Sequence, residues 1–116
     1  MIRAVAIGAA LSLAIHVILG WAWTLLAGLV AGFFAKRLHG LAGGLAVGLA
    51  WSMLIVYSFA VAGAPTGRMI TVTGYIFGGL PSVLVLVATL LIGVILGTAG
   101  GLLSTPVLHF WNRARL

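Results

Sequence analysis

The chain has 116 residues, of which 64% are hydrophobic and 5% are charged, and it contains six Lys or Arg but no Asp, Glu or Cys. This composition excludes a soluble globular domain, since too few polar residues are present to cover a core. The lack of Cys excludes disulfides and thiolate metal sites, and the lack of carboxylates excludes a Ser-His-carboxylate triad. The recurring apolar runs predict an all-α integral membrane protein. Because carboxylates and thiols are missing, we expect that the protein is not an enzyme and has no cofactor.

The first apolar run is too long for one membrane span. Residues 4–35 carry no Lys or Arg, and a single helix of that length would extend about 48 Å against a hydrocarbon core of about 30 Å. We therefore expect a helical hairpin with helices over 3–19 and 21–35, joined near Gly20. The bulky "WAW" that follows offers no cleavage site for a signal peptide, so the first helix is expected to be retained.

The second half of the chain predicts two more helices. The basic loop "KRLHG" (36–40) precedes a helix over 41–62, and "GAPTGR" (63–68) contains breakers that predict a turn. A last helix is predicted over 81–103, with Pro81 in its first turn, where a missing N–H is tolerated. Residues 69–80 are β-branched and glycine-containing, so a re-entrant piece, an interfacial piece and an extension of the last helix all remain open. Residues 1–116 are thus expected to form a single transmembrane domain.

The distribution of basic residues predicts the topology. With both termini cytoplasmic, Arg3 and the other basic residues lie inside, and Arg68 alone lies outside, in agreement with the positive-inside rule. The predicted location is a prokaryotic cytoplasmic membrane. Because the charges lie at the ends of apolar runs, nucleic-acid binding is not expected. Without carboxylate partners in the chain, the inner charges are expected to contact anionic lipid headgroups: Lys36, Arg37, Arg113 and Arg115.

Each predicted helix carries a row of small residues at a spacing of four, which places them on one face. Inside a bilayer, such rows permit close backbone approach between helices, as in a glycine zipper. We interpret them as packing faces, either within one chain, in a homo-oligomer or against other membrane subunits. The glycines assigned to helix packing are Gly8, Gly28, Gly32, Gly40, Gly44, Gly48, Gly93, Gly97 and Gly101.

A few polar residues are candidates for contacts beyond packing. His16 lies within an apolar run and is expected to bond a carbonyl or hydroxyl, with a ligand or proton role as the alternative. Arg68 is either a solvated charge or a contact for an anionic ligand. Trp51 lies near the middle of its helix, so its indole N–H is expected to find an acceptor. A pair formed by His39 and His109 at the inner face is also open.

The stretches "LLAGLVAGFFAKRLHGLAGGLAVGLAW" (25–51) and "IGVILGTAGGLL" (92–103) resemble small, glycine-rich, four-helix membrane proteins of unknown function in archaea and bacteria. The resemblance implies a bundle of four short transmembrane helices and implies no activity. Two functions follow as hypotheses. The first is a non-enzymatic accessory subunit that self-associates, or docks in a larger complex, through its glycine-rich faces. The second is a small oligomeric channel, carrier or holin-like pore.

Overall fold

A computed structural model describes residues 1–115 of the chain. Within these residues the fold is all-helical, as the sequence predicts. Its elements, in chain order, are α1 (Ile2–Ile18), a single 3₁₀ turn η1 (Trp21–Trp23), α2 (Thr24–Phe34), α3 (His39–Ile76) and α4 (Ser82–Ala114).

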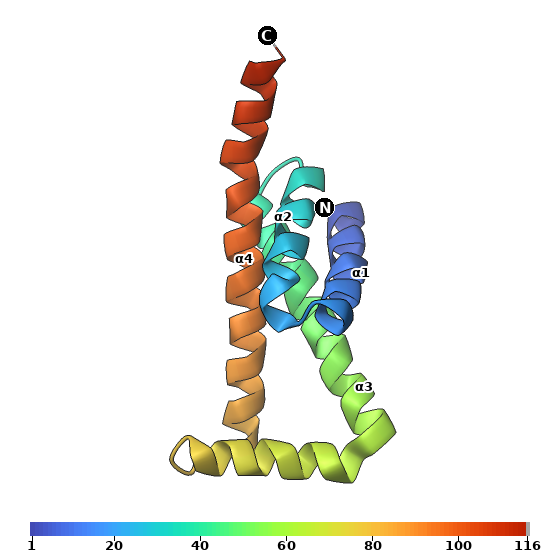
Figure 1. Cartoon of the computed structure of the whole chain (residues 1–116), viewed down its shortest axis with the longest axis vertical. Helices are drawn as coiled ribbons and strands as arrows, with labels where there is room; N and C mark the ends of the chain where they lie inside the picture. The colour runs from blue at the N-terminus through green and yellow to red at the C-terminus, as the bar shows by residue number, and fades with distance from the viewer. Residues whose placement is uncertain (116) are drawn as a thin grey trace.

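The helices form a bundle with two different ends. At the closed end, which holds both termini, the helices pack directly against one another. The open end is the one that the second part of α3 crosses. α1 and α2 form a hairpin that packs against the first part of α3, while α4 lies along α2 and α3. Both termini and the α2–α3 connection lie toward the same end of the molecule (Figure 1). At the opposite end, the second part of α3 runs across the bundle axis before the chain returns as α4.

The predicted turn at 63–68 is wrong, because these residues are helical. The predicted helix end at 62 coincides with a kink at Ala62, where φ is −143° and ψ is 60°. Pro65 has no N–H to donate to the carbonyl of Val61, so the old helix cannot continue unchanged. The ring is tolerated in the first turn of a new helical stretch. The transverse segment, residues 63–76 of α3, therefore replaces the predicted turn and takes up most of 69–80.

The other boundaries differ from the predictions in one main respect. The helix predicted over 81–103 continues to Ala114 and contains Pro106. Proline is tolerated inside apolar helices when the freed backbone groups find other partners. The residues that follow the predicted helix are thus helical up to Ala114, and α4 extends beyond the rest of the bundle (Figure 1).

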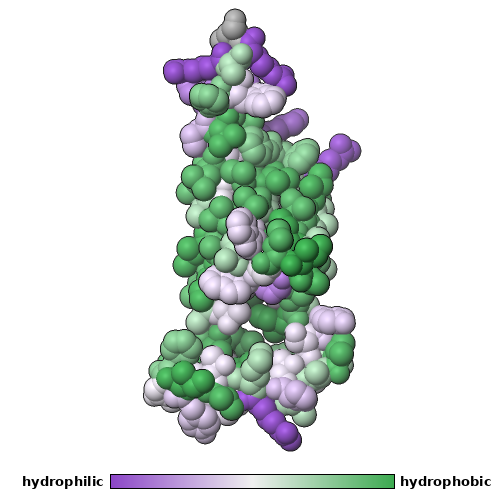
Figure 2. Space-filling model, in the orientation of Figure 1, coloured by the Kyte–Doolittle hydropathy of each residue, from purple (hydrophilic) through white to green (hydrophobic). Residues whose placement is uncertain are grey.

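Small residues fill the inside of the bundle, and large apolar residues cover its outside. The buried residues of α1 and α2 are all Ala, Gly, Ser or Thr. Most Leu, Ile, Val and Phe side chains are exposed instead. Figure 2 shows a broad hydrophobic band between hydrophilic groups at the two ends. α3 and α4 are each long and apolar enough to cross a membrane, whereas α1 and α2 are shorter apolar helices.

The glycines assigned to helix packing are all buried, and all of them touch another helix of the same chain. The closest approach is reciprocal: a Cβ at Gly43 would overlap the carbonyl oxygen of Gly97, and a Cβ at Gly97 would overlap that of Gly43. A Cβ at Gly28 would lie 2.9 Å from the Cα of Gly97. Three helices thus meet backbone to backbone around Gly97, which leaves no space between them.

Candidate functional site

The different lengths of the helices create a space at the open end. α1 has 17 residues and extends about 26 Å. The first part of α3, residues 39–61, extends about 35 Å, so it continues past the tip of the α1–α2 hairpin. The transverse segment then crosses the open end of the bundle at a distance from that tip. A gap remains between the hairpin tip, the two parts of α3 and α4.

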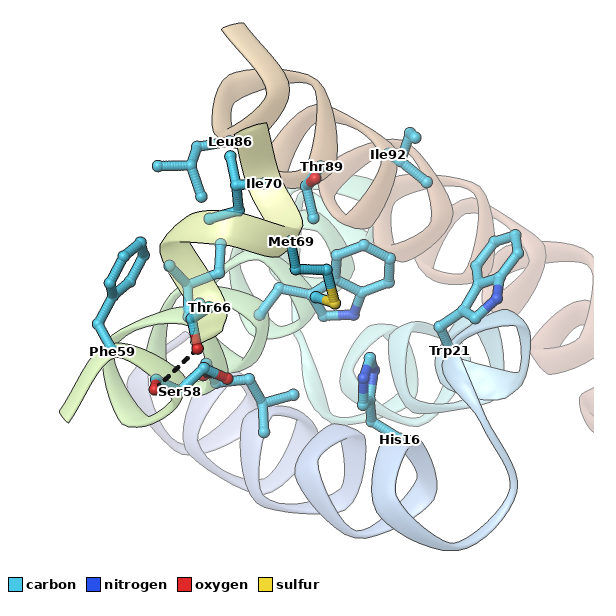
Figure 3. Close-up of a pocket in the computed structure, with 13 residues that line it drawn as sticks. His16, Trp21, Ser58, Phe59, Thr66, Met69, Ile70, Leu86, Thr89 and Ile92 are labelled. Carbon is cyan, nitrogen blue, oxygen red and sulfur yellow. Dashed lines mark hydrogen bonds between the residues drawn. The ribbon is translucent and has the colours of Figure 1, made fainter. Parts of the chain in front are cut away.

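This gap is a cavity of about 450 Å³, within the range of pockets that enclose small-molecule ligands. His16 and Trp21 line it from the hairpin tip, and Ser58, Phe59 and Thr66 line it at the kink of α3 (Figure 3). The rest of the wall comes from α3 and α4: Trp51, Leu54, Ile55, Met69, Ile70, Leu86, Thr89 and Ile92.

Trp51 is packed at the boundary between the tight part of the bundle and the cavity. Its side chain is 6% exposed and clusters with Ala27 and Val47. A Cβ on Gly93 would lie 2.7 Å from Cδ2 of the Trp51 indole. The missing side chain of Gly93 therefore makes the room in which the indole lies. Gly93 belongs to a predicted packing row, and in the structure it seats this aromatic ring.

The indole N–H of Trp51 is buried and has no hydrogen-bond partner anywhere in residues 1–115. The expectation that it finds a facing carbonyl or hydroxyl is therefore wrong, and two other rings pack against the indole instead. The rings of His16 and Trp51 meet edge to face at 5.5 Å between centroids, and Trp21 approaches Trp51 at 6.5 Å. A buried donor without an acceptor is costly, typically by about 1–3 kcal/mol.

His16 contributes a second polar atom without a partner. Its Nδ1 is buried and, within the described part of the chain, makes no hydrogen bond. The prediction that His16 bonds a carbonyl or a neighbouring hydroxyl is therefore also wrong. Nδ1 can donate or accept, depending on the tautomer of the ring. Trp51 and His16 both line the cavity. Each carries a buried nitrogen without a partner: Nε1 of Trp51 is an obligate donor, and Nδ1 of His16 can take either role.

Each hydroxyl group in the cavity already donates a hydrogen bond to a backbone carbonyl. Ser58 Oγ donates to the Leu54 carbonyl over 2.9 Å, and Thr89 Oγ1 donates to the Val85 carbonyl over 2.8 Å. Thr66 Oγ1 donates across the kink to the Ser58 carbonyl over 3.1 Å. Each oxygen still has lone pairs, so these residues can only accept further hydrogen bonds in this arrangement.

The lining residues of the cavity range from strongly exposed to buried. Met69 is 67% exposed, Trp21 57% and Ile92 47%, so large hydrophobic side chains form the rim. Trp51 and Ile70, in contrast, are buried. No residue with a formal charge at neutral pH lies among the residues that line this cavity. The cavity therefore favours an uncharged molecule that enters through an apolar surface.

Arg68, the other candidate contact, lies outside this cavity. It lines a second hollow of about 580 Å³, together with other residues of the transverse segment and the start of α4. The two hollows share Phe59, Ile70 and Leu86 as a common wall. The structure thus does not bring His16 and Arg68 into one site.

The predicted inner-face residues lie at the closed end of the bundle. Lys36 and Arg37 are exposed in the α2–α3 connection, and Arg113 and Arg115 are exposed at the end of α4. His39 donates from Nδ1 to the Gly32 carbonyl over 2.7 Å, which ties the start of α3 to the end of α2. His109 is exposed on α4.

Several cavity residues were missed in the sequence. Ser58, Thr66 and Thr89 look like ordinary helix hydroxyls, and Met69 and Ile70 fall in the stretch whose structure was left open. The available signal was Trp51. Its indole N–H lies in the middle of an apolar helix and needs an acceptor there. Neither a family model, nor a curated protein, nor a solved structure matches this chain.

Proposed function

We propose that the chain is an integral membrane protein with both termini on the cytoplasmic side of a prokaryotic cytoplasmic membrane. The support is the distribution of side chains: small residues inside, and a belt of large apolar residues outside. The charged residues add to it, since all but Arg68 lie on elements at the end that holds both termini. α3 and α4 cross the bilayer, α1 and α2 enter it as a shorter hairpin, and the transverse segment lies at the outer interface.

Cysteine labelling tests this topology, because the chain has no Cys of its own. Leu38 is 64% exposed in the α2–α3 connection, and a side chain at Gly67 would meet nothing within 4 Å. In intact cells, we expect a membrane-impermeant maleimide to label Gly67→Cys and to leave Leu38→Cys unlabelled until the membrane is opened. Labelling of both variants from the same side would contradict the topology.

We further propose that the protein is a non-enzymatic binding protein of the carrier class, which takes up a small apolar molecule in the cavity. The observation that carries this proposal is the buried, unpartnered indole N–H of Trp51 in a cavity of about 450 Å³. Proteins rarely leave such a donor unsatisfied unless an external group completes it. No residue arrangement for covalent or acid–base chemistry accompanies it among the residues that line the cavity.

Quenching of tryptophan emission by bromodecane tests the binding function. Two proteins are compared in lipid nanodiscs, one with Trp51 as its only tryptophan and one with only Trp111, which is 57% exposed on α4. We expect saturable quenching of Trp51 and linear quenching of Trp111, because only Trp51 lines a cavity of limited capacity. Linear quenching of both would contradict the proposal, since it would show partition into lipid alone.

We also propose the accessory-subunit role, but through a different surface from the glycine-rich faces. The glycine rows are engaged within the chain, so a homo-oligomer or a larger membrane complex would form through the outer, large apolar side chains instead. Anionic headgroups are proposed to contact the exposed basic residues at the closed end, namely Lys36, Arg37, Arg113 and Arg115. Co-purification with a larger complex, or a particle size in mild detergent above that of a monomer, would support the association. A monomeric size without co-purifying subunits would contradict it.

A further inference from the structure

We infer that the molecule bound in the cavity is an uncharged lipophile with a carbonyl or hydroxyl oxygen, and that this oxygen is held by Trp51 Nε1 and His16 Nδ1. The inference rests on the proposed binding function and names the chemical class of its ligand. It follows from three features of the cavity: its two unpartnered nitrogens, the absence of charge in its wall and the apolar character of its mouth.

The two unpartnered nitrogens select for oxygen. Trp51 Nε1 can only donate, so its partner has to be an acceptor. A carbonyl oxygen can accept from Trp51 and, at its second lone pair, from His16 when Nδ1 carries the proton. A hydroxyl group can accept from Trp51 and donate to His16 when Nδ1 is unprotonated. Either group offers a suitable partner to each of the two unpartnered nitrogens, which an alkyl chain cannot do.

The wall selects against charge. No Lys, Arg, Asp or Glu lines the cavity, and the desolvation of an ion is costly where no opposite charge compensates it. Arg68 is separated from this space by the shared wall of Phe59, Ile70 and Leu86. A carboxylate or phosphate is therefore a poor occupant, although a positive residue lies close by.

The size and the mouth select for an apolar body. One water molecule occupies about 30 Å³ in the liquid, so a water between Trp51 and His16 would leave most of the 450 Å³ empty. Away from Ser58, Thr66 and Thr89 the wall is apolar, and an apolar wall does not hold ordered water. Leu54, Ile55 and Leu86 line this remaining space, and the rim consists of exposed Trp21, Met69 and Ile92. Because this rim is apolar and exposed, we expect the bound molecule to enter directly from the lipid phase.

The test uses four ten-carbon probes that differ only in their polar group: decanol, methyl decanoate, decane and decanoate. The protein is held in nanodiscs, and the indole N–H resonance of Trp51 is followed by NMR, with Trp51→Phe identifying the signal. We expect decanol and methyl decanoate to shift the signal saturably. Their affinities should exceed that of decane by about three- to tenfold, the range of one net hydrogen bond. Decanoate should bind at least about tenfold more weakly than decanol.

Two variants separate the oxygen contact from a general loss of structure. His16→Leu should lower the affinity for decanol by about three- to tenfold and leave that for decane unchanged, because only the oxygen contact is removed. Trp111→Phe changes a tryptophan outside the cavity and should alter neither affinity. Helical circular dichroism of all three proteins should be the same.

Each of the other outcomes refutes one specific part of the inference or of the proposed binding function. If decane binds as tightly as decanol, the oxygen contact is refuted while the binding function stands. If decanoate binds best, the uncharged class is refuted. If no probe shifts the Trp51 signal, and bromodecane quenching is also linear, the binding function itself fails. If quenching is saturable but the indole signal already has a hydrogen-bonded shift that no probe changes, a bound water alone satisfies Trp51 and the inference is refuted.

Discussion

The closed and open ends of the bundle are built from the same two helices, α3 and α4, but they differ in what separates those helices. At the closed end, Gly43 and Gly97 bring the backbones into direct contact and leave no space. At the open end, the kink at Ala62 turns α3 aside, and Phe59, Ile70 and Leu86 stand between the helices. At one end the helices are in direct contact, and at the other they leave a cavity that is open to the outside.

This difference shows how a chain with almost no charged residues can position a specific polar site. The closed end fixes α3 against α4 through close backbone packing. Gly93 lies at the boundary, and its missing side chain seats Trp51. The packed region therefore positions the indole that lines the cavity, and the glycine rows contribute to the candidate site through this packing.

The largest expected effect comes from placing the same bulky side chain at each end of α4. Ser104 is fully buried at the closed end, against Gly32, whereas Thr89 lines the cavity. We expect Ser104→Phe to lower the free energy of unfolding by more than about 3 kcal/mol, because no space exists for the ring. Thr89→Phe should keep the fold and block bromodecane quenching of Trp51. Denaturation in mixed micelles measures the first effect, and equal losses for both variants would contradict the comparison.

A smaller effect is expected from a single methyl group at the closest contact. Gly97→Ala places a Cβ against the backbone of Gly43 and 2.8 Å from Cβ of Val47. Backbone atoms cannot move aside as a flexible side chain can, so α3 and α4 must separate. We expect the free energy of unfolding to fall by about 1–3 kcal/mol, measured in the same mixed micelles. An unchanged value would mean that the helices are less closely packed than described.

Gly93→Ala tests the link between the two ends. The new methyl group would meet the Trp51 ring, which can rotate, so we expect a loss of stability of about 1 kcal/mol, at the lower limit for overpacking. The indole should move, which would shift its emission and weaken decanol binding by at least about threefold. Gly48→Ala is the matched control, since its Cβ would meet only Cγ2 of Val94. If both variants bind decanol equally, Gly93 does not position Trp51.

The packing of the closed end could be predicted from the sequence, because spacing along one helix determines which residues share a face. The rows from Gly40 to Gly48 and from Gly93 to Gly101 are buried as expected. Gly43 and Gly100 were missed, since they lie one position beside the rows. Adjacent glycine pairs at 43–44 and 100–101 were the available signal. The all-helical fold follows from the same periodic, apolar pattern.

The open end could not be predicted, because it depends on angles and on relative lengths. Pro65 and its glycine neighbours indicate a break, but they do not tell whether the chain turns or starts a new helix. The cavity exists only because the α1–α2 hairpin ends before the transverse segment. The unpartnered state of Trp51 and His16 depends on that gap, so the candidate site is a property of the tertiary structure.

The smallest expected effect has the opposite sign from Gly97→Ala, although the substitution is the same. Gly67 lies in the transverse segment, and an added Cβ there would meet nothing within 4 Å. Alanine restricts the unfolded chain and favours the helix, so Gly67→Ala should raise the free energy of unfolding by about 0.5–1 kcal/mol. Denaturation in mixed micelles measures the shift. A loss of stability would show that the transverse segment contacts a neighbour at this point, and the open end would then be less open than the cavity implies.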